Sequence, residues 1–375
     1  MSCGLLQSHA AKSKAATDTR AMAPTRTPQS DVGAARCQRR AVAMPWPYAE
    51  RDEAFLKRLT VAASAEFANP AHGTPTMSLF SRFLGRRKIG GVAGGMLVAN
   101  PDLKSPLSLQ VLFAEPYRLD ADRLVGALKS YHASMSEARC EIDAELGQEG
   151  TLLGMIGWGQ HAVRLVGFNA PMPVAAVETC VAPSHYPKEL KDRARAHRAH
   201  VILYYAGYEA SPFDRYVALA AAAGVLGRLG ALVVLNESAR TSCPVAVLAG
   251  ADAEGDVMEF LRAFPVLLLY CGFVKLDVEG VAGVWMRTFG APLIELPDLA
   301  AHARGHEEGQ RYFDMFENIF GYLRGPGSRL ALGDTMQIGE QDYVRFRAPS
   351  KDEDFLADGG ELLVADSIGA QDINR

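Results

Sequence analysis

Paired cysteines are missing from this chain of 375 residues. Six cysteines are scattered singly through the sequence, and none forms a Cys-x-x-Cys pair. Their spacing excludes zinc ribbons, dithiol redox motifs and a dense disulfide scaffold. Cys180, Cys243 and Cys271 stand in apolar contexts, so we expect them to be small buried residues of the core.

Positive charge is scarce in the part of the chain that we expect to fold. Residues 1–76 carry ten Lys/Arg against six Asp/Glu, which leaves 29 against 37 for residues 77–375. Such an acidic body disfavours nucleic acid or a membrane as a partner. It fits a cytoplasmic protein that binds a basic protein partner.

Targeting signals and membrane spans are also lacking. The N-terminus has no continuous apolar segment of the kind that a secretory signal needs. The apolar stretch YVALAAAAGVLGRLGALVVL, residues 216–235, contains Arg228 and three glycines. It predicts a helix that ends at Gly230, followed by a short strand, rather than a membrane span.

Motifs for phosphate binding and nucleophilic catalysis are absent. The glycine-rich stretch GRRKIGGVAGGMLVANP, residues 85–101, follows no strand and lacks a Gly-Lys-Ser/Thr ending, so it predicts a flexible linker. No Gly-x-Ser-x-Gly elbow is present, and His132, His161 and His185 are isolated in separate segments. We therefore expect no cofactor.

The chain divides into segments of different character. Residues 1–76 lack periodicity and read as a disordered tail or an over-extended gene start, with an organelle transit peptide as the alternative. Residues 77–104 predict a short basic helix and the glycine-rich linker. An N-terminal half at 105–208, a C-terminal half at 209–366 and a tail at 367–375 complete the organisation.

Hydrophobic periodicity predicts an α+β fold with mostly antiparallel or mixed sheets and helices packed on one face. Hairpin-like strand pairs outnumber strand–helix–strand crossovers, and the recurring rhythm suggests two similar layered halves. The longest predicted helix is 299–325, in which Phe313, Phe316 and Phe320 form an apolar stripe. Residues 265–277 and 292–298 are predicted to be strands.

Three stretches resemble the domain-of-unknown-function 4261 family of bacterial proteins. They are TFGAPLIELPD (288–298), QRYFDMFENIFGYL (310–323) and LALGDTMQIGEQDYVRF (330–346). The resemblance covers roughly 105–366 and is most specific in 288–346. One departure is Leu293, where the family pattern has an acidic residue. The resemblance implies a fold but no established activity, and by analogy an immunity-type or protein-interaction module.

Two sets of polar residues are candidates for chemistry. Asp334 and Thr335 follow Gly333 in a turn, and with Glu295 they are the candidate catalytic residues; ordinary turn chemistry is the alternative. His302 and His306 are spaced i, i+4 in the predicted helix and would share one face, as a two-histidine metal site needs. The dense charge around them favours a solvated helix start over a metal site, so no metal is expected.

Aromatic and basic residues provide candidate binding positions. Tyr204, Tyr205 and Tyr208 cluster after an apolar strand, and Arg345 alternates with apolar neighbours on another. In the C-terminal unit, four polar residues are predicted to line one surface: Thr288, Glu295, Arg345 and Ser350. The pair His197 and His200 straddles a helix-to-strand boundary, which favours structural hydrogen bonds over half of a metal site.

The leading hypothesis is a non-catalytic cytoplasmic interaction module, an immunity-type binder of a basic protein partner. One alternative is a hydrolytic or metal-dependent enzyme that uses Asp334, Glu295 and the histidines His302 and His306. A second alternative is a structural subunit of a homo-oligomer. The sequence leaves the oligomeric state open.

Overall fold

The structure is a computed structural model, and it describes residues 97–143, 151–250, 255–340, 342–357 and 360–373. All of these residues belong to Pro47–Arg375, the larger of two compact units of the chain. The interpretations of residues 1–76 and of the basic helix after Met77 therefore lie outside the described residues.

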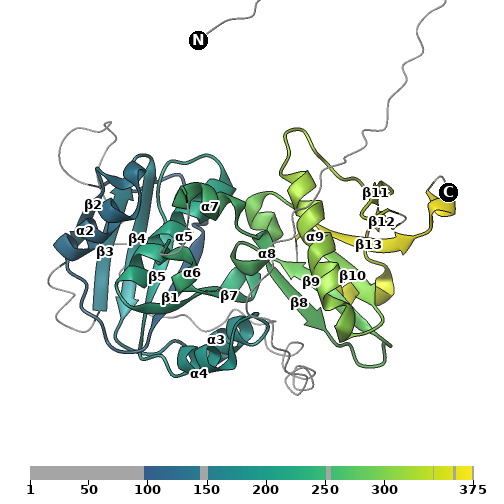
Figure 1. The fold of residues 1–375 in the computed structure, drawn as a ribbon, viewed down its shortest axis with the longest axis horizontal. Coiled ribbons are helices and arrows are strands. Elements are labelled where there is room, and N and C mark those ends of the chain that lie inside the picture. The colour runs from purple at the N-terminus through teal and green to yellow at the C-terminus, as the bar shows by residue number, and fades with distance from the viewer. Residues whose placement is uncertain (1–96, 144–150, 251–254, 341, 358–359, 374–375) are drawn as a thin grey trace, which may run out of the picture. The chain divides into compact units, whose positions relative to one another are not determined.

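The first sheet is antiparallel throughout and has seven strands in the described residues (Figure 1). In spatial order these are β2 (Arg139–Ile142), β3 (Thr151–Trp158), β4 (His161–Phe168), β5 (Ala199–Tyr205), β1 (Ser108–Phe113), β6 (Ala231–Asn236) and β7 (Thr241–Pro244). A two-residue turn joins β3 to β4. Its Gly159 has a φ of +52°, a conformation that favours glycine because glycine lacks a Cβ.

Helices cover both faces of this sheet. On one face, α2 (Ala121–Tyr131) and α5 (Pro212–Arg228) pack in the main core with Leu109 and Val111 of β1. On the other face, α3 (Val174–Val181) and α4 (Lys188–Arg195) pack with Leu112. Because β1 is buried on both faces, the sheet carries one helix layer more than the sequence predicts.

Helix α5 ends where the sequence predicts, and local capping sets its start. The Ser211 hydroxyl accepts a hydrogen bond from the backbone N–H of Asp214 at 3.2 Å, and Pro212 occupies the first turn. Gly230 has a φ of +103°, which ends the helix before β6. Within the described ranges, no helix combines the length and apolarity needed to cross a bilayer.

The second sheet has six strands in the described residues, with the order β11-β12-β13-β10-β9-β8. Their bounds are Thr335–Gln337, Tyr343–Arg347, Leu362–Ile368, Asp298–Ala303, Val284–Phe289 and Gly272–Leu276. The pair β10–β13 is parallel and the others are antiparallel. Helix α9 (Gly309–Leu323) buries Phe316 and Phe320 in the core. The predicted α+β class with antiparallel and mixed sheets is confirmed.

The short helices α6 (Val245–Leu248), α7 (Val257–Ala263) and α8 (Val266–Leu269) connect the two sheets along the chain. The boundary predicted between residues 208 and 209 falls between β5 and α5, which both belong to the layers of the first sheet. One cluster of buried apolar side chains contains both Leu109 of the first sheet and Phe346 of the second. The predicted N-terminal and C-terminal halves therefore share one hydrophobic core.

The strand predicted at 265–277 is wrong in its first part, which forms α8. The Glu317 carboxylate accepts the backbone N–H of Leu267 at 2.7 Å and so caps α8 from a distant part of the chain. Burial raises the pKa of Glu317. A cap supplied across 50 positions leaves no local signal in the sequence.

The helix predicted at 299–325 and the strand predicted at 292–298 are also wrong in part. Residues Ala291–Ile294 form a 3-10 helix, Asp298–Ala303 form β10, and α9 begins only at Gly309. The alanines of β10 are buried between β9 and β13. Strand pairing on both sides therefore outweighs their preference for a helix.

Candidate functional site

The Gly333-Asp334-Thr335 motif forms a β-bulge at the start of β11. The N–H of Gly333 donates to Phe346 O at 2.7 Å, and the N–H of Phe346 donates to Asp334 O at 2.9 Å. Gly333 has a φ of +91°, which a side chain rarely tolerates. The Asp334 carboxylate accepts the N–H of Ala331 at 2.7 Å and holds the preceding turn.

A charged network joins β12, β13 and the 3-10 helix Lys351–Leu356. The Arg347 guanidinium donates to both carboxylate oxygens of Glu353, at 2.6 and 2.8 Å, and to both of Asp366, at 2.6 and 3.3 Å. Hydrogen bonding to Arg347 lowers the pKa of Glu353 to about 2. Ser350 completes a capping box with Glu353. This network fixes the outer part of the second sheet.

Four of the predicted site residues lie in this outer part of the second sheet, residues 334–372, which we call the outer unit. Thr335 pairs with Arg345 across β11 and β12, Asp334 precedes Thr335, and Ser350 follows β12. Arg345 is partly buried, and its guanidinium donates to Asp372 O. The fold brings these four residues together, although their side-chain contacts are mainly structural.

The outer unit is strongly acidic. Residues 334–372 contain ten Asp/Glu and three Lys/Arg. Among the residues that the structure describes, six of these carboxylate side chains are exposed, and we call them the acidic edge: Asp334, Glu340, Asp342, Asp352, Asp354 and Glu361. Asp334, Glu340, Asp342 and Glu361 lie next to the ends of β11, β12 and β13, and Asp352 and Asp354 lie in the 3-10 helix Lys351–Leu356. Figure 1 shows these three strands at the outer end of the second sheet. Two large apolar side chains are exposed beside them, Leu332 at 62% and Phe355 at 39%.

Glu295 and Thr288 do not join this unit. Glu295 is exposed at the end of the 3-10 helix Ala291–Ile294, with a φ of +62°. Thr288 is fully buried, and its hydroxyl donates to the Asp298 carboxylate at 3.1 Å and accepts the N–H of Leu299 at 2.7 Å. The prediction that Thr288 lines a surface is wrong, because it fastens β9 to β10. Asp298, which also accepts the N–H of Ala291 at 3.1 Å, was missed.

The histidines His302 and His306 are not on one helix face. His302 lies on β10, and its Nε2 contacts Ala282 O at 2.7 Å. His306 lies in the 3-10 helix His306–Glu308, and its Nε2 contacts the Asp277 carboxylate at 2.9 Å. The prediction that the two histidines share one helix face is wrong, because residues 302–306 do not form a helix. Across the described residues no three His, Cys, Asp or Glu side chains are grouped to hold a metal ion.

The three predicted tyrosines do not form one surface. Tyr205 is buried at 1% exposure, and its hydroxyl contacts His161 Nδ1 and accepts the N–H of Glu209, both at 3.1 Å. Tyr204 is partly buried on the opposite face of β5, since neighbouring strand residues alternate. Tyr208 is 48% exposed. Of the three, Tyr208 offers the largest accessible side chain.

The cysteines Cys180, Cys243 and Cys271 are buried core residues, as predicted. Burial raises the pKa of all three thiols, for Cys243 to about 12. A buried thiol with a raised pKa stays protonated at neutral pH and is a poor nucleophile.

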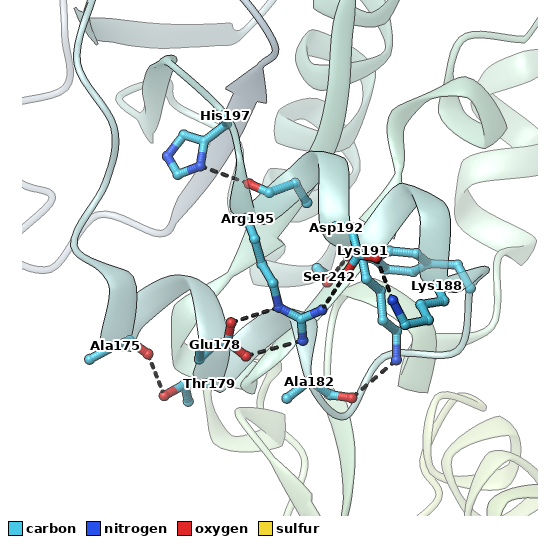
Figure 2. Close-up of polar contacts among 12 residues, drawn as sticks. Ala175, Glu178, Thr179, Ala182, Lys188, Lys191, Asp192, Arg195, His197 and Ser242 are labelled. Carbon is cyan, nitrogen blue, oxygen red and sulfur yellow. Dashed lines mark hydrogen bonds and ion pairs between the residues drawn. The ribbon is translucent and has the colours of Figure 1, made fainter. Parts of the chain in front are cut away.

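The helices α3 and α4 carry a second polar cluster (Figure 2). The Arg195 guanidinium contacts both oxygens of Glu178, at 2.6 and 3.1 Å, and Asp192 at 3.2 Å. Lys188 contacts Asp192 at 2.6 Å. The buried Ser242 hydroxyl of β7 donates to Cys180 O at 3.1 Å. These contacts pin the helix pair together and onto the sheet.

His197 and His200 have separate structural partners. The ring of His197 contacts Ala194 O through Nδ1 and accepts the N–H of Met172 through Nε2, both at 2.7 Å. His200 Nδ1 contacts Ala170 O at 2.8 Å. Burial lowers the pKa of both imidazoles, which favours their neutral form. The predicted structural role of this pair fits these contacts.

His197→Leu should lower the free energy of unfolding by about 1–2 kcal/mol, because the buried N–H of Met172 loses its acceptor. Urea denaturation at neutral pH measures this. Because both ring nitrogens of His197 are occupied, zinc should leave the melting temperature of the wild type unchanged. A zinc-dependent rise that disappears in His197→Leu would show a metal site instead.

Comparison with known proteins adds no relative: the chain matches no family model, no curated protein and no solved structure. The resemblance to the domain-of-unknown-function 4261 family therefore stays a prediction. The candidate site is defined by the geometry and charge of the chain itself.

Proposed function

We propose that the protein is a non-catalytic binding module that engages a basic segment of a partner protein through the acidic edge. The observation that carries this proposal is the charge of residues 334–372, with ten Asp/Glu against three Lys/Arg and six exposed carboxylates. Clustered charge of one sign raises the local concentration of oppositely charged partners and speeds their association.

The basic residues of the outer unit leave most of this negative charge uncompensated. Arg347 is engaged with Glu353 and Asp366, neither of which belongs to the acidic edge. The exposed Leu332 and Phe355 add apolar area beside the carboxylates. A mixture of apolar contacts and a charged rim is typical of protein interfaces.

Three of the residues predicted to be catalytic or to bind a metal have structural contacts instead, and this supports a binding role. Asp334 holds the turn before β11, His302 contacts a backbone carbonyl, and His306 contacts a single carboxylate. Each side chain therefore has a partner that explains its position in the fold. A cytoplasmic location and an immunity-type role, with a basic toxin domain as the partner, are parts of this proposal that rest on charge and on the family resemblance.

The test uses a blocked octapeptide of alternating lysine and valine as a basic probe. Glu340→Gln, Asp342→Asn and Asp354→Asn together form the edge variant. Weakening three exposed charge pairs should raise the Kd about tenfold at low salt. Fluorescence anisotropy with a labelled peptide measures the Kd.

A matched control removes the same charge elsewhere. Asp102→Asn, Asp122→Asn and Glu137→Gln together neutralise three exposed carboxylates in residues 102–137, outside the outer part of the second sheet. This control variant should change the Kd by less than about twofold, because its charges lie outside the proposed site. Equal losses in both variants, or no loss in the edge variant, would refute the acidic edge as the binding site.

A further inference from the structure

The hydrogen-bonding pattern of β11 determines which of its backbone groups face outward. The N–H of Phe346 donates to Asp334 O, the N–H of Ile338 donates to Asp342 O, and Met336 is opposite Val344. Residues 334, 336 and 338 thus direct their backbone groups at β12. Because these directions alternate along an antiparallel strand, the N–H and C=O groups of Thr335 and Gln337 point to the other side.

That other side is an edge of the second sheet. In the part of the chain that the structure describes, β11 is the last strand of the order β11-β12-β13-β10-β9-β8. Gln337 is exposed and Thr335 is partly exposed, whereas Met336 and Ile338 pack on the core. The Gln337 side chain donates to Gly339 O and Glu340 O, at 2.8 and 3.0 Å, and fixes the end of the strand. The edge is therefore held in an extended conformation by its own hairpin.

The negative charge beside β11 determines which kind of strand could pair with this edge. The exposed carboxylates of Asp334 and Glu340 lie just before and after β11. Two copies of this edge would bring like charges together, which disfavours pairing of the protein with itself. An incoming strand with basic side chains would instead meet carboxylates at both ends.

We propose that the partner contributes a lysine- or arginine-rich extended segment that adds to β11 as a further strand. Its backbone would pair with Thr335 and Gln337, and its basic side chains would contact the acidic edge. Addition of a strand at a sheet edge obtains affinity from main-chain hydrogen bonds and specificity from alternate side chains. This inference rests on the proposed function and specifies the conformation of its partner.

The experiment compares Gln337→Pro with Gln337→Ala, using the same lysine–valine octapeptide. Both variants lose the side-chain contacts of Gln337, but only proline removes the outward N–H and leaves the bonds to β12 intact. Loss of one main-chain hydrogen bond should raise the Kd about fivefold in Gln337→Pro relative to Gln337→Ala. Thermal melting confirms that each variant is folded.

An octapeptide of the same charge with every backbone nitrogen methylated provides a second test that does not depend on the proline variant. Weaker binding of this peptide to the wild type supports strand addition. Equal binding of both peptides, together with equal Kd values for the two Gln337 variants, would overturn strand addition while leaving the acidic edge as a binding surface. If the edge variant binds like the wild type, the proposed function itself fails.

Discussion

Gly224→Ala should lower the free energy of unfolding by about 3 kcal/mol, although alanine is the better helix former. Gly224 lies inside α5, where a Cβ would meet the carbonyl of Leu248 and, at 2.6 Å, the hydroxyl of Tyr131. These two groups are hydrogen-bonded to each other, so neither moves away easily. The close approach of α5 to α6 and α2 therefore requires glycine at this position.

Gly126→Ala is the matched control for this prediction. Gly126 is in α2 and exposed, and a Cβ there would have nothing within 4 Å. The same substitution should raise the free energy of unfolding by about 0.5–1 kcal/mol, because only the helix preference changes. Urea denaturation of both variants measures the contrast. A gain in stability at Gly224 would contradict the packing of α5 against α6.

Arg347→Met should lower the free energy of unfolding by about 2–3 kcal/mol at neutral pH. The substitution leaves the Glu353 and Asp366 carboxylates, which the guanidinium contacts in pairs of hydrogen bonds, without that partner. Arg347 is about one third exposed, at 35% of its side chain, so water screens part of the loss. Arg329→Met, at an exposed position of the same half, should change stability by less than about 0.5 kcal/mol.

The effect of Arg347→Met should also depend on pH. The pKa of Glu353 is lowered from its ordinary 4.5 to about 2 in the folded protein. Its stabilising contribution is therefore present above the unfolded pKa and is lost as the pH falls through the folded value. The difference between the wild type and Arg347→Met should shrink to less than about 1 kcal/mol near pH 2. A difference that does not change between neutral and acidic pH would contradict the ion-pair network.

Local signals in the sequence predicted the elements that depend on neighbouring residues. Ser211, Pro212 and Gly230 mark the ends of α5 because capping and a left-handed φ are local requirements. The turn at Gly159 is predictable for the same reason. Elements decided by distant contacts were mispredicted. The alanines of β10 are buried between two strands that periodicity does not place there, and α8 is capped by Glu317 of α9.

The candidate site was predictable in position but not in character. Asp334, Thr335 and Arg345 lie together because they are close in sequence and share one hairpin. Their roles were not visible, since the bulge at Gly333 and the backbone contact of Arg345 depend on the folded register. The buried pair Thr288 and Asp298 was missed because a turn of 3-10 helix, not a regular period, brings the two side chains together.

The central claim is that the acidic edge binds a basic segment, and the salt dependence of that binding tests it most directly. The Kd of the lysine–valine octapeptide should rise steeply between about 50 and about 300 mM NaCl for the wild type and the control variant, because salt screens exposed charges. For the edge variant, Glu340→Gln with Asp342→Asn and Asp354→Asn, the Kd should be higher at low salt and change much less. Identical salt dependence in all three proteins would contradict the account.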